Sequence, residues 1–241
     1  MLTKKYFLLV LALCCLNYNS TLLAVDEVFE HHHGRRIFHA FELESAVGDS
    51  KEGQVQWVDL DGWIGSDYHK LWLKTEFERI DSQTDTLETW GLYSRYLSTF
   101  WDAQIGIRHD AKPHSLFYFV FGLEGLASYF IETEFHIFLS EKGDVSARLH
   151  LERDFLITQQ WVFQPFLETE IFFQNVPDLE AARGISGLEL GLQCRYKITP
   201  KVAPYLEVRY ERKIGGTAAL ARSHSDAVEN VLFFLGIKFL I

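Results

Sequence analysis

Apolar and polar residues alternate along almost the whole chain after residue 36. The segment 101–110, WDAQIGIRHD, has apolar side chains at 101, 103, 105 and 107 and mostly charged or polar side chains between them. Successive residues of a strand point to opposite faces of a sheet, so this period of two predicts strands with one apolar and one polar face. No segment shows a convincing apolar period of 3.6 residues, which would indicate an amphipathic helix.

The alternation predicts twelve strands, most of them about ten residues long. A tilted strand of about 9–11 residues crosses a bilayer, whereas strands of soluble proteins are usually about five or six residues long. The predicted strands cover residues 37–47, 54–64, 68–79, 87–97, 100–110, 116–126, 129–140, 145–156, 160–172, 186–196, 202–212 and 229–241.

The connections between these strands alternate in length. The longer connections are residues 48–53, 79–85, 111–115, 141–144, 173–185 and 213–228, and short turns lie between them. Long loops at one end and short turns at the other are typical of an outer-membrane barrel. The pattern therefore predicts an all-β fold, a closed antiparallel transmembrane β-barrel with an apolar outer face and a wet lumen. The alternative is a secreted β-sandwich whose apolar faces pack together.

Large aromatic residues near the ends of the predicted strands are expected to form girdles at the membrane surface. They are Trp57, Trp63, Trp90, Trp101, Trp161, Tyr205 and Phe239.

The first 24 residues have the features of a secretory signal peptide. Two lysines precede an apolar run, Tyr6–Leu16, that is too short to span a membrane as a helix. A lipoprotein signal at Cys14 is the alternative, although Leu13 stands where a small residue is expected. The predicted organisation is a signal peptide at 1–24, a short periplasmic histidine-containing segment at 25–36, and an outer-membrane barrel at 37–241.

The charge and the cysteines narrow the possible partners. The formal net charge of −10 argues against nucleic acid and is compatible with cations. Signal cleavage would leave Cys194 as the single cysteine, so no internal disulfide is expected.

Two groups of side chains are candidate metal ligands. His31, His32 and His33 could chelate a divalent ion through neutral imidazoles, or could belong to a solvated linker. The second group lies on the predicted lumen face, where acids outnumber bases and would concentrate cations. Interlocked ion pairs are the alternative role for these side chains. The candidates on that face are Glu132, Glu134, His136, Asp154, Glu168 and Glu170, and Asp67 and His69 near a short turn could extend the group.

The same alternation of faces along the predicted strands places Arg95 and the glycines at 106, 122, 191 and 236 on the inner face. We expect these glycines to relieve crowding in the lumen or to permit strand bending.

Seven blocks of the sequence resemble the CopB/PcoB family of copper resistance proteins and occur in the order of that family. They are WIGSDYHKLWLKTEFE (63–78), YSRYLSTFWDAQIGIRHD (93–110), GLEGLASYFIETE (122–134), FLSEKGDVSARLHLERDFLITQQ (138–160), GLELGLQCRY (187–196), APYLEVRYE (203–211) and GGTAALAR (215–222). The resemblance implies a Gram-negative outer-membrane barrel that binds copper. Such a protein would contribute to copper tolerance or trafficking across the outer membrane, alongside periplasmic copper proteins.

One departure from the family bears on the oxidation state of copper. Family members commonly carry a long N-terminal segment rich in Met and His, which here is reduced to VDEVFEHHHGRR, and residues 25–241 contain no methionine. Cu(I) favours soft sulfur ligands, whereas imidazole and carboxylate suit Cu(II). We therefore expect that any copper the protein holds is Cu(II), or is held weakly.

Two other function classes stay open from the residues alone. One is a general small-solute porin or a structural outer-membrane barrel. The other is an outer-membrane lipid hydrolase, which is disfavoured because His224–Ser225–Asp226 and His114–Ser115 are neighbours in loops, without the base and orienting group that a serine nucleophile needs. We expect no enzyme.

Overall fold

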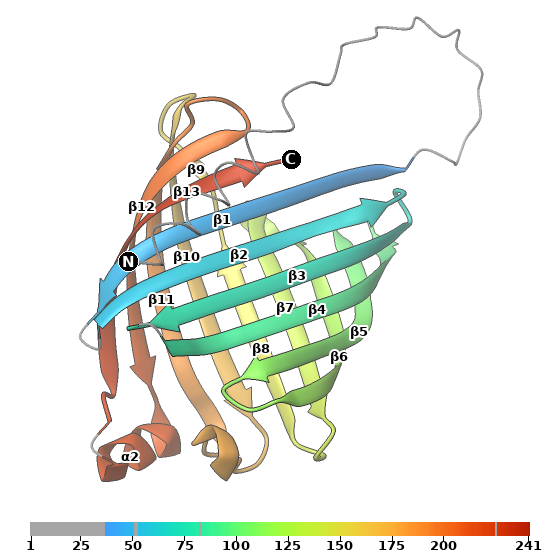
Figure 1. The fold of residues 1–241 in the computed structure, drawn as a ribbon. Helices are drawn as coiled ribbons and strands as arrows, with labels where there is room; N and C mark the ends of the chain where they lie inside the picture. Colours follow the sequence, from blue (N-terminus) through green and yellow to red (C-terminus); the bar gives the residue numbers. More distant parts are fainter. Residues whose placement is uncertain (1–36, 51–52, 82, 225) are drawn as a thin grey trace, which may run out of the picture. The chain divides into compact units, whose positions relative to one another are not determined.

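The computed structural model of this chain describes residues 37–241, except 51–52, 82 and 225. The predicted signal peptide and the segment 25–36, with His31, His32 and His33, lie outside the described residues. The described chain forms one antiparallel sheet that curls into a barrel (Figure 1). In these residues, no helix combines the length and the apolar character needed to cross a bilayer.

The sheet closes on itself. Neighbouring strands pair in sequence order, β10 pairs with β8, β9 and β11, and β1 pairs with β13. The elements are β1 (Phe38–Ser50), β2 (Gly53–Gly65), β3 (His69–Ile80), β4 (Gln83–Ser98), β5 (Trp101–Lys112), β6 (Leu116–Ala127), η1 (Ser128–Phe130), β7 (Ile131–Ser140), β8 (Val145–Glu152), β9 (Phe155–Leu156), β10 (Trp161–Phe172), η2 (Pro177–Leu179), β11 (Gly184–Tyr196), β12 (Val202–Lys213), α2 (Gly215–His224) and β13 (Glu229–Leu240).

The predicted twelve-strand barrel is confirmed. The structure divides the predicted strand 145–156 into β8 and the two-residue β9, with Arg153 and Asp154 between them, and both pieces pair with β10. The two pieces together occupy one crossing of the barrel wall. The sheet therefore has thirteen labelled strands and twelve crossings.

The outer face of the barrel is apolar, and much of the inner face is polar. Phe121 and Leu206 are 49% and 61% exposed, whereas Glu44, Gln104 and Asp110 are buried in the lumen. A closed sheet satisfies its own backbone hydrogen bonds, so such an outer face can contact lipid tails at little cost. The alternation predicted from the sequence thus has the expected orientation.

The extents of several predicted loops are wrong. Pairing of β1 with β2 continues to Ser50 and Gly53, and pairing of β3 with β4 continues to Ile80 and Gln83. Backbone pairing does not require an apolar outer face beyond the bilayer, so strands extend into segments whose polar composition indicates loops. Two long connections, 173–183 and 214–228, define what we call the long-loop end of the barrel. The opposite, short-turn end has connections such as 66–68 and 99–100.

The helix α2 was not predicted. Its sequence, GGTAALARSH, lacks a stripe of large apolar residues, and its buried positions are Thr217, Ala218 and Ala221. These small side chains allow the helix to pack closely at the long-loop end (Figure 1). The Thr217 hydroxyl oxygen accepts a 3.0 Å hydrogen bond from the backbone N–H of Ala182, which links α2 to the connection 173–183.

The predicted aromatic girdle is largely wrong in its members. Trp90 and Tyr205 are only 6% and 2% exposed inside the barrel, and Trp57, Trp63 and Trp101 line the lumen. Their rings fill the space that a small barrel leaves between its inward-facing side chains. Aromatic side chains are exposed near the short-turn end at other positions, together with Trp161: Tyr68, Tyr93, Tyr96, Phe100, Tyr129 and Phe130.

Arg95 was also assigned to the wrong face. It is exposed, whereas its neighbour Ser94 is 1% exposed and points inward with Leu92 and Trp90. The predicted role of the inner glycines is consistent with the structure, and Gly122 and Gly191 show it clearly. A Cβ atom on Gly122 would collide with the His136 ring, and one on Gly191 would collide with the Phe166 ring.

The orientation of the apolar face can be tested at Phe121, which lies near the middle of β6. We expect Phe121→Arg to lower the free energy of unfolding of the barrel in phospholipid vesicles by about 2–4 kcal/mol, because the charge would face hydrocarbon. Urea titration of folding measures this change, with Phe121→Leu as the matched control. Equal stability of the two variants would show that this face does not contact lipid.

Candidate functional site in the barrel lumen

Two cavities lie along the lumen and share part of their walls. Their volumes are about 250 and 580 Å³, and Glu134, His150 and Glu152 line both. The larger cavity lies toward the short-turn end, where Asp67 and Trp101 line it. The walls of the smaller cavity hold ten carboxylates and two histidines but only four Lys or Arg side chains. The lumen therefore carries an excess of negative charge.

Part of this excess lies in a row of carboxylates on four adjacent strands, which we call the acidic row. Strand register places Glu44 beside Asp59, Asp59 beside Glu76, and Glu76 beside Glu88, on β1 to β4. Like charges directly opposite each other on neighbouring strands are destabilising. The acidic row is therefore an arrangement that needs compensating positive charge.

The ends of the acidic row have that compensation. Lys238 Nζ lies 2.7 Å from Glu44 Oε1, and Arg108 Nη2 lies 2.6 Å from Glu88 Oε1.

The middle of the acidic row has less compensating positive charge nearby. Asp59 and Glu76 make no ion pair within 4.0 Å in the described part of the chain. Glu76 accepts a 3.2 Å hydrogen bond from the indole N–H of Trp57. The two central carboxylates thus face the smaller cavity without a cation within 4.0 Å, and Lys74 and Arg148 attract them only from farther away.

The cations of the lumen are shared between carboxylates. Lys74 Nζ lies 3.1 Å from Asp61 and 2.7 Å from Glu134. Lys238 likewise lies within 2.7 Å of both Glu42 and Glu44. Because each ammonium group balances two acids, these pairs leave a net negative charge.

Arg148 is the centre of the largest such group. Its guanidinium lies 2.8 Å from Glu170, 3.4 Å from Glu88 and 3.5 Å from Glu168. The same guanidinium lies 5.7 Å from the ring centre of Trp90, within the range of cation–π attraction. Arg148 thus joins strands β4, β8 and β10 through the lumen.

Strand register brings most of the predicted metal ligands into one region. Glu134 of β7 and Glu168 of β10 both lie beside His150 of β8, and His136 and Glu170 both lie beside Arg148. The register thus brings these side chains of β7 and β10 to the same part of the lumen.

Several of these side chains already have protein partners. Glu134 pairs with Lys74, Glu170 with Arg148, and Asp154 with Arg195. Glu132 lines the larger cavity.

His136 is a packed side chain of the lumen. It is 2% exposed, its Nε2 lies 2.8 Å from Gln104 Oε1, and its ring is edge-on to Trp90 at a centroid distance of 5.3 Å. The ring lies against Gly122, where no other residue would leave space for it. This environment resembles that of a satisfied core histidine more than that of an open metal ligand.

His150 also faces the lumen, although it is not among the candidate ligands named from the sequence. Its Nδ1 lies 3.1 Å from Glu168 and its Nε2 lies 3.5 Å from Glu152. The two nitrogens point to opposite sides of the ring, so these carboxylates cannot join His150 around one ion. An imidazole that donates to both must carry both protons.

The two candidates near the short turn lie in different places. Asp67 lines the larger cavity. His69 is exposed, and its Nδ1 lies 2.5 Å from the hydroxyl of Tyr93, which is itself exposed on the outer face. His69 and Lys70 are adjacent in β3 and point to opposite faces, and Lys70 faces the lumen. His69 is therefore separated from the other candidate ligands.

Among the described residues, one group of His, Cys, Asp or Glu side chains has three donor atoms within 4.8 Å of one another. It consists of Glu180, His224 and Asp226 at the long-loop end. None of the predicted lumen ligands belongs to it. The lumen residues thus form an ion-pair network with a negative excess rather than a preformed three-ligand metal centre.

Asp59, Asp61 and Glu88 face the lumen but were not among the residues predicted to do so. They share strand faces with Trp57, Trp63 and Trp90, which were assigned to membrane girdles. The signal was present in the alternation of β2 and β4, but the assumption that large aromatic rings lie outside the barrel concealed it.

The comparisons with known proteins agree with this fold. The family described as copper resistance protein B precursor (CopB) matches residues 35–240. The chain belongs to this family. It is 35% identical over 191 residues to a copper resistance protein B homolog of Pseudomonas syringae pv. tomato, a match that covers 79% of this chain and 65% of that one.

A second relative extends the comparison. The chain is 33% identical over 180 residues to copper resistance protein B of Escherichia coli, and the match covers 74% of this chain and 61% of that protein. The chain thus spans less than two thirds of the length of these two relatives.

Solved structures support the barrel architecture of this family member. The NanC porin superposes with a TM-score of 0.58 at 14% identity, over 82% of this chain and 98% of that one. The KdgM porin superposes with a TM-score of 0.52 at 9% identity, with the same coverage of both chains. At these identities the likeness concerns the fold alone, which is that of an outer-membrane barrel.

The ion-pair network predicts different costs for two cation deletions. We expect Arg148→Met to destabilise the barrel by about 3–5 kcal/mol, because it leaves several carboxylates without their buried partner. Urea unfolding followed by tryptophan fluorescence measures the loss.

Lys142→Met is the matched control. Lys142 lies 2.6 Å from Asp178 at the exposed long-loop end, and its hydrogen bond lowers the pKa of Asp178 below the usual value. Removal of this solvated pair should leave stability unchanged. Equal losses in the two variants would contradict a special role for the lumen network.

Proposed function

We propose that this protein binds Cu(II) in the lumen of an outer-membrane barrel and so contributes to copper tolerance or to copper trafficking across that membrane. The observation that carries the proposal is the excess of carboxylates around the lumen cavities. Membership of the copper resistance protein B family supports copper as the cation. The expected partners are copper ions, outer-membrane lipid and periplasmic copper proteins, and we expect no catalytic activity.

The middle of the acidic row is the part of the lumen best suited to a divalent ion. Asp59 and Glu76 are strand neighbours that repel each other and have no cation within 4.0 Å in the described chain. A divalent ion between or beside them would replace repulsion with attraction in a confined space of low dielectric constant. The acidic row is therefore expected to be more stable with a bound cation than without one.

The types of donor in the lumen favour the oxidised ion. Carboxylates and imidazoles suit Cu(II), and Cu(II) binds such ligands more tightly than the other divalent first-row metals. The lumen cavities offer no thioether or thiol, the soft donors that Cu(I) prefers.

The arrangement of the two cavities suits passage as well as binding. Both cavities are rich in acids and share Glu134, His150 and Glu152, so a cation that enters near Asp67 meets carboxylates from the short-turn end to the acidic row. Shared, exchangeable ion pairs such as Lys74 with Asp61 and Glu134 could yield to an incoming ion.

The acidic row can be tested directly. We expect the double variant Asp59→Asn/Glu76→Gln to bind Cu(II) at least about tenfold more weakly, a loss of about 1.4 kcal/mol in binding free energy. Refolded protein in detergent would be titrated with Cu(II) and followed by electron paramagnetic resonance. His31, His32 and His33 should be replaced by alanine in every sample, so that copper bound outside the lumen does not hide the effect.

A control variant removes the same charge from the surface. Asp49→Asn/Glu141→Gln changes two exposed carboxylates outside the lumen and should leave the affinity unchanged. If both double variants bind copper as the parent does, the acidic row is not the site. If both lose affinity equally, the net charge of the protein and not the lumen sets the binding.

The proposed ligand role of the segment 25–36 needs a separate test. We expect His31→Ala/His32→Ala/His33→Ala, made in an otherwise unchanged chain, to remove one class of Cu(II) site and its nitrogen hyperfine signal while the lumen class remains. His39→Ala, an exposed histidine of β1, is the control. An unchanged spectrum in the triple variant would mean that these histidines belong to a solvated linker.

A further inference from the structure

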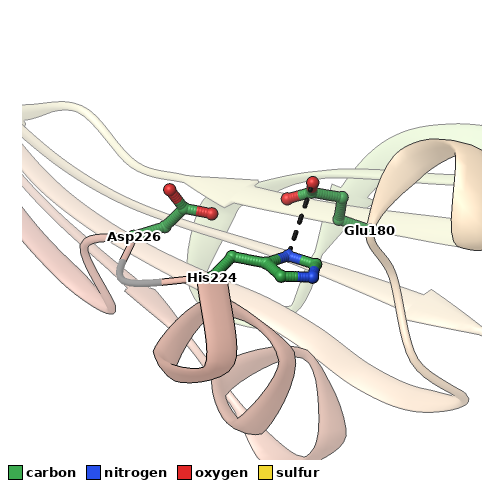
Figure 2. A group of neighbouring side chains, drawn as sticks. All are labelled: Glu180, His224 and Asp226. Atoms are coloured by element: carbon green, nitrogen blue, oxygen red, sulfur yellow. Dashed lines mark ion pairs between the residues drawn. The ribbon is translucent and has the colours of Figure 1, made fainter.

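We propose that Glu180, His224 and Asp226 form a divalent transition-metal site at the long-loop end of the barrel, separate from the lumen. The three side chains come from the two long connections of the barrel. Glu180 follows η2 in the connection 173–183, whereas His224 ends α2 and Asp226 follows it in the connection 214–228. Figure 2 shows the three side chains turned toward a common space, with the His224 ring facing Glu180.

The separations fit ligands of one metal ion. One donor atom from each residue lies within 4.8 Å of the others, and His224 Nδ1 lies 3.6 Å from Glu180 Oε1. This last distance is too long for a hydrogen bond. Two ligands with metal bonds of about 2.0–2.1 Å stand roughly 3.0–3.4 Å apart around a metal. The His224–Glu180 pair is close to that separation, and the Asp226 donor, within 4.8 Å of both, would move inward to complete the site.

The backbone around the site is already held in place. The hydrogen bond from Ala182 N–H to Thr217 Oγ1 joins the two connections, and the N–H of Asp226 donates a 2.9 Å bond to the carbonyl of Ala221. Ala181 and Ala221 are buried beside these contacts. The described backbone that carries Glu180 and His224 is therefore tied together by these contacts.

The electrostatics also favour a cation. His224 lies in the last turn of α2, where the unpaired carbonyls of a helix carry partial negative charge. Glu180 and Asp226 add two carboxylates, and all three side chains are exposed to solvent. One imidazole and two carboxylates suit Zn(II) or Cu(II), with at least one coordination position left to water.

Limited trypsin digestion can report on this site without reference to the lumen. Arg183 and Arg222 are exposed, and each lies within three residues of a proposed ligand. If Zn(II) fastens the two connections, a concentration about ten times Kd should slow cleavage at both arginines by about tenfold. The fragments would be identified by mass, using refolded full-length protein in detergent with His31, His32 and His33 replaced by alanine.

The variants separate this site from other binding. His224→Ala and Glu180→Gln should each abolish the protection by Zn(II), while His114→Ala, another exposed loop histidine, should keep it. Asp59→Asn/Glu76→Gln should also keep it, so failure of the lumen proposal would not affect this test. Absence of protection in the parent protein, or its persistence in His224→Ala, would overturn the inference.

Discussion

The closed hydrogen-bonded sheet is the constraint on which the rest of this structure depends. Lipid offers no partners for backbone N–H and C=O groups, so a chain that crosses a bilayer in strands must pair the first strand with the last. Here β1 pairs with β13 over eight residue pairs, from Glu42 with Leu240 to Asp49 with Phe233. Once the sheet is closed, alternate side chains must face either lipid or lumen. The high aromatic content, 15%, is consistent with those two environments, because large rings serve both on the lipid face and as filling of the lumen.

Closure also determines how the charged side chains are arranged. A twelve-crossing barrel has a narrow interior, so side chains from strands far apart in sequence meet there, as Lys74 of β3 meets Glu134 of β7. Guanidinium groups lie against aromatic rings, and glycines provide the space that rings such as that of His136 occupy. The lumen is largely filled, and its remaining cavities are small and acidic.

Two kinds of cation environment result from this architecture. In the lumen, many carboxylates share few cations, which gives a diffuse negative potential but no compact set of three ligands in the described residues. At the long-loop end, two short segments bring an imidazole and two carboxylates close together in contact with water. The first environment suits ions that bind and exchange, and the second suits an ion that stays and joins two loops. Copper resistance protein B relatives make a copper role reasonable for the first.

The sequence by itself determined the fold class, the number of crossings and the acidic character of the lumen, because a period of two over strands of this length reports directly on two opposite environments. Register and ring placement were decided only in three dimensions. Trp90 and Tyr205 face inward, although large aromatic rings near strand ends suggested a membrane girdle. The assignment of such rings to the girdle hid Glu88 in β4 and Asp59 in β2. The approach of Glu180 to His224 depends on how α2 packs at the long-loop end, and no local pattern encodes that contact. Parity is a property of one strand, whereas a site requires side chains from several segments to meet.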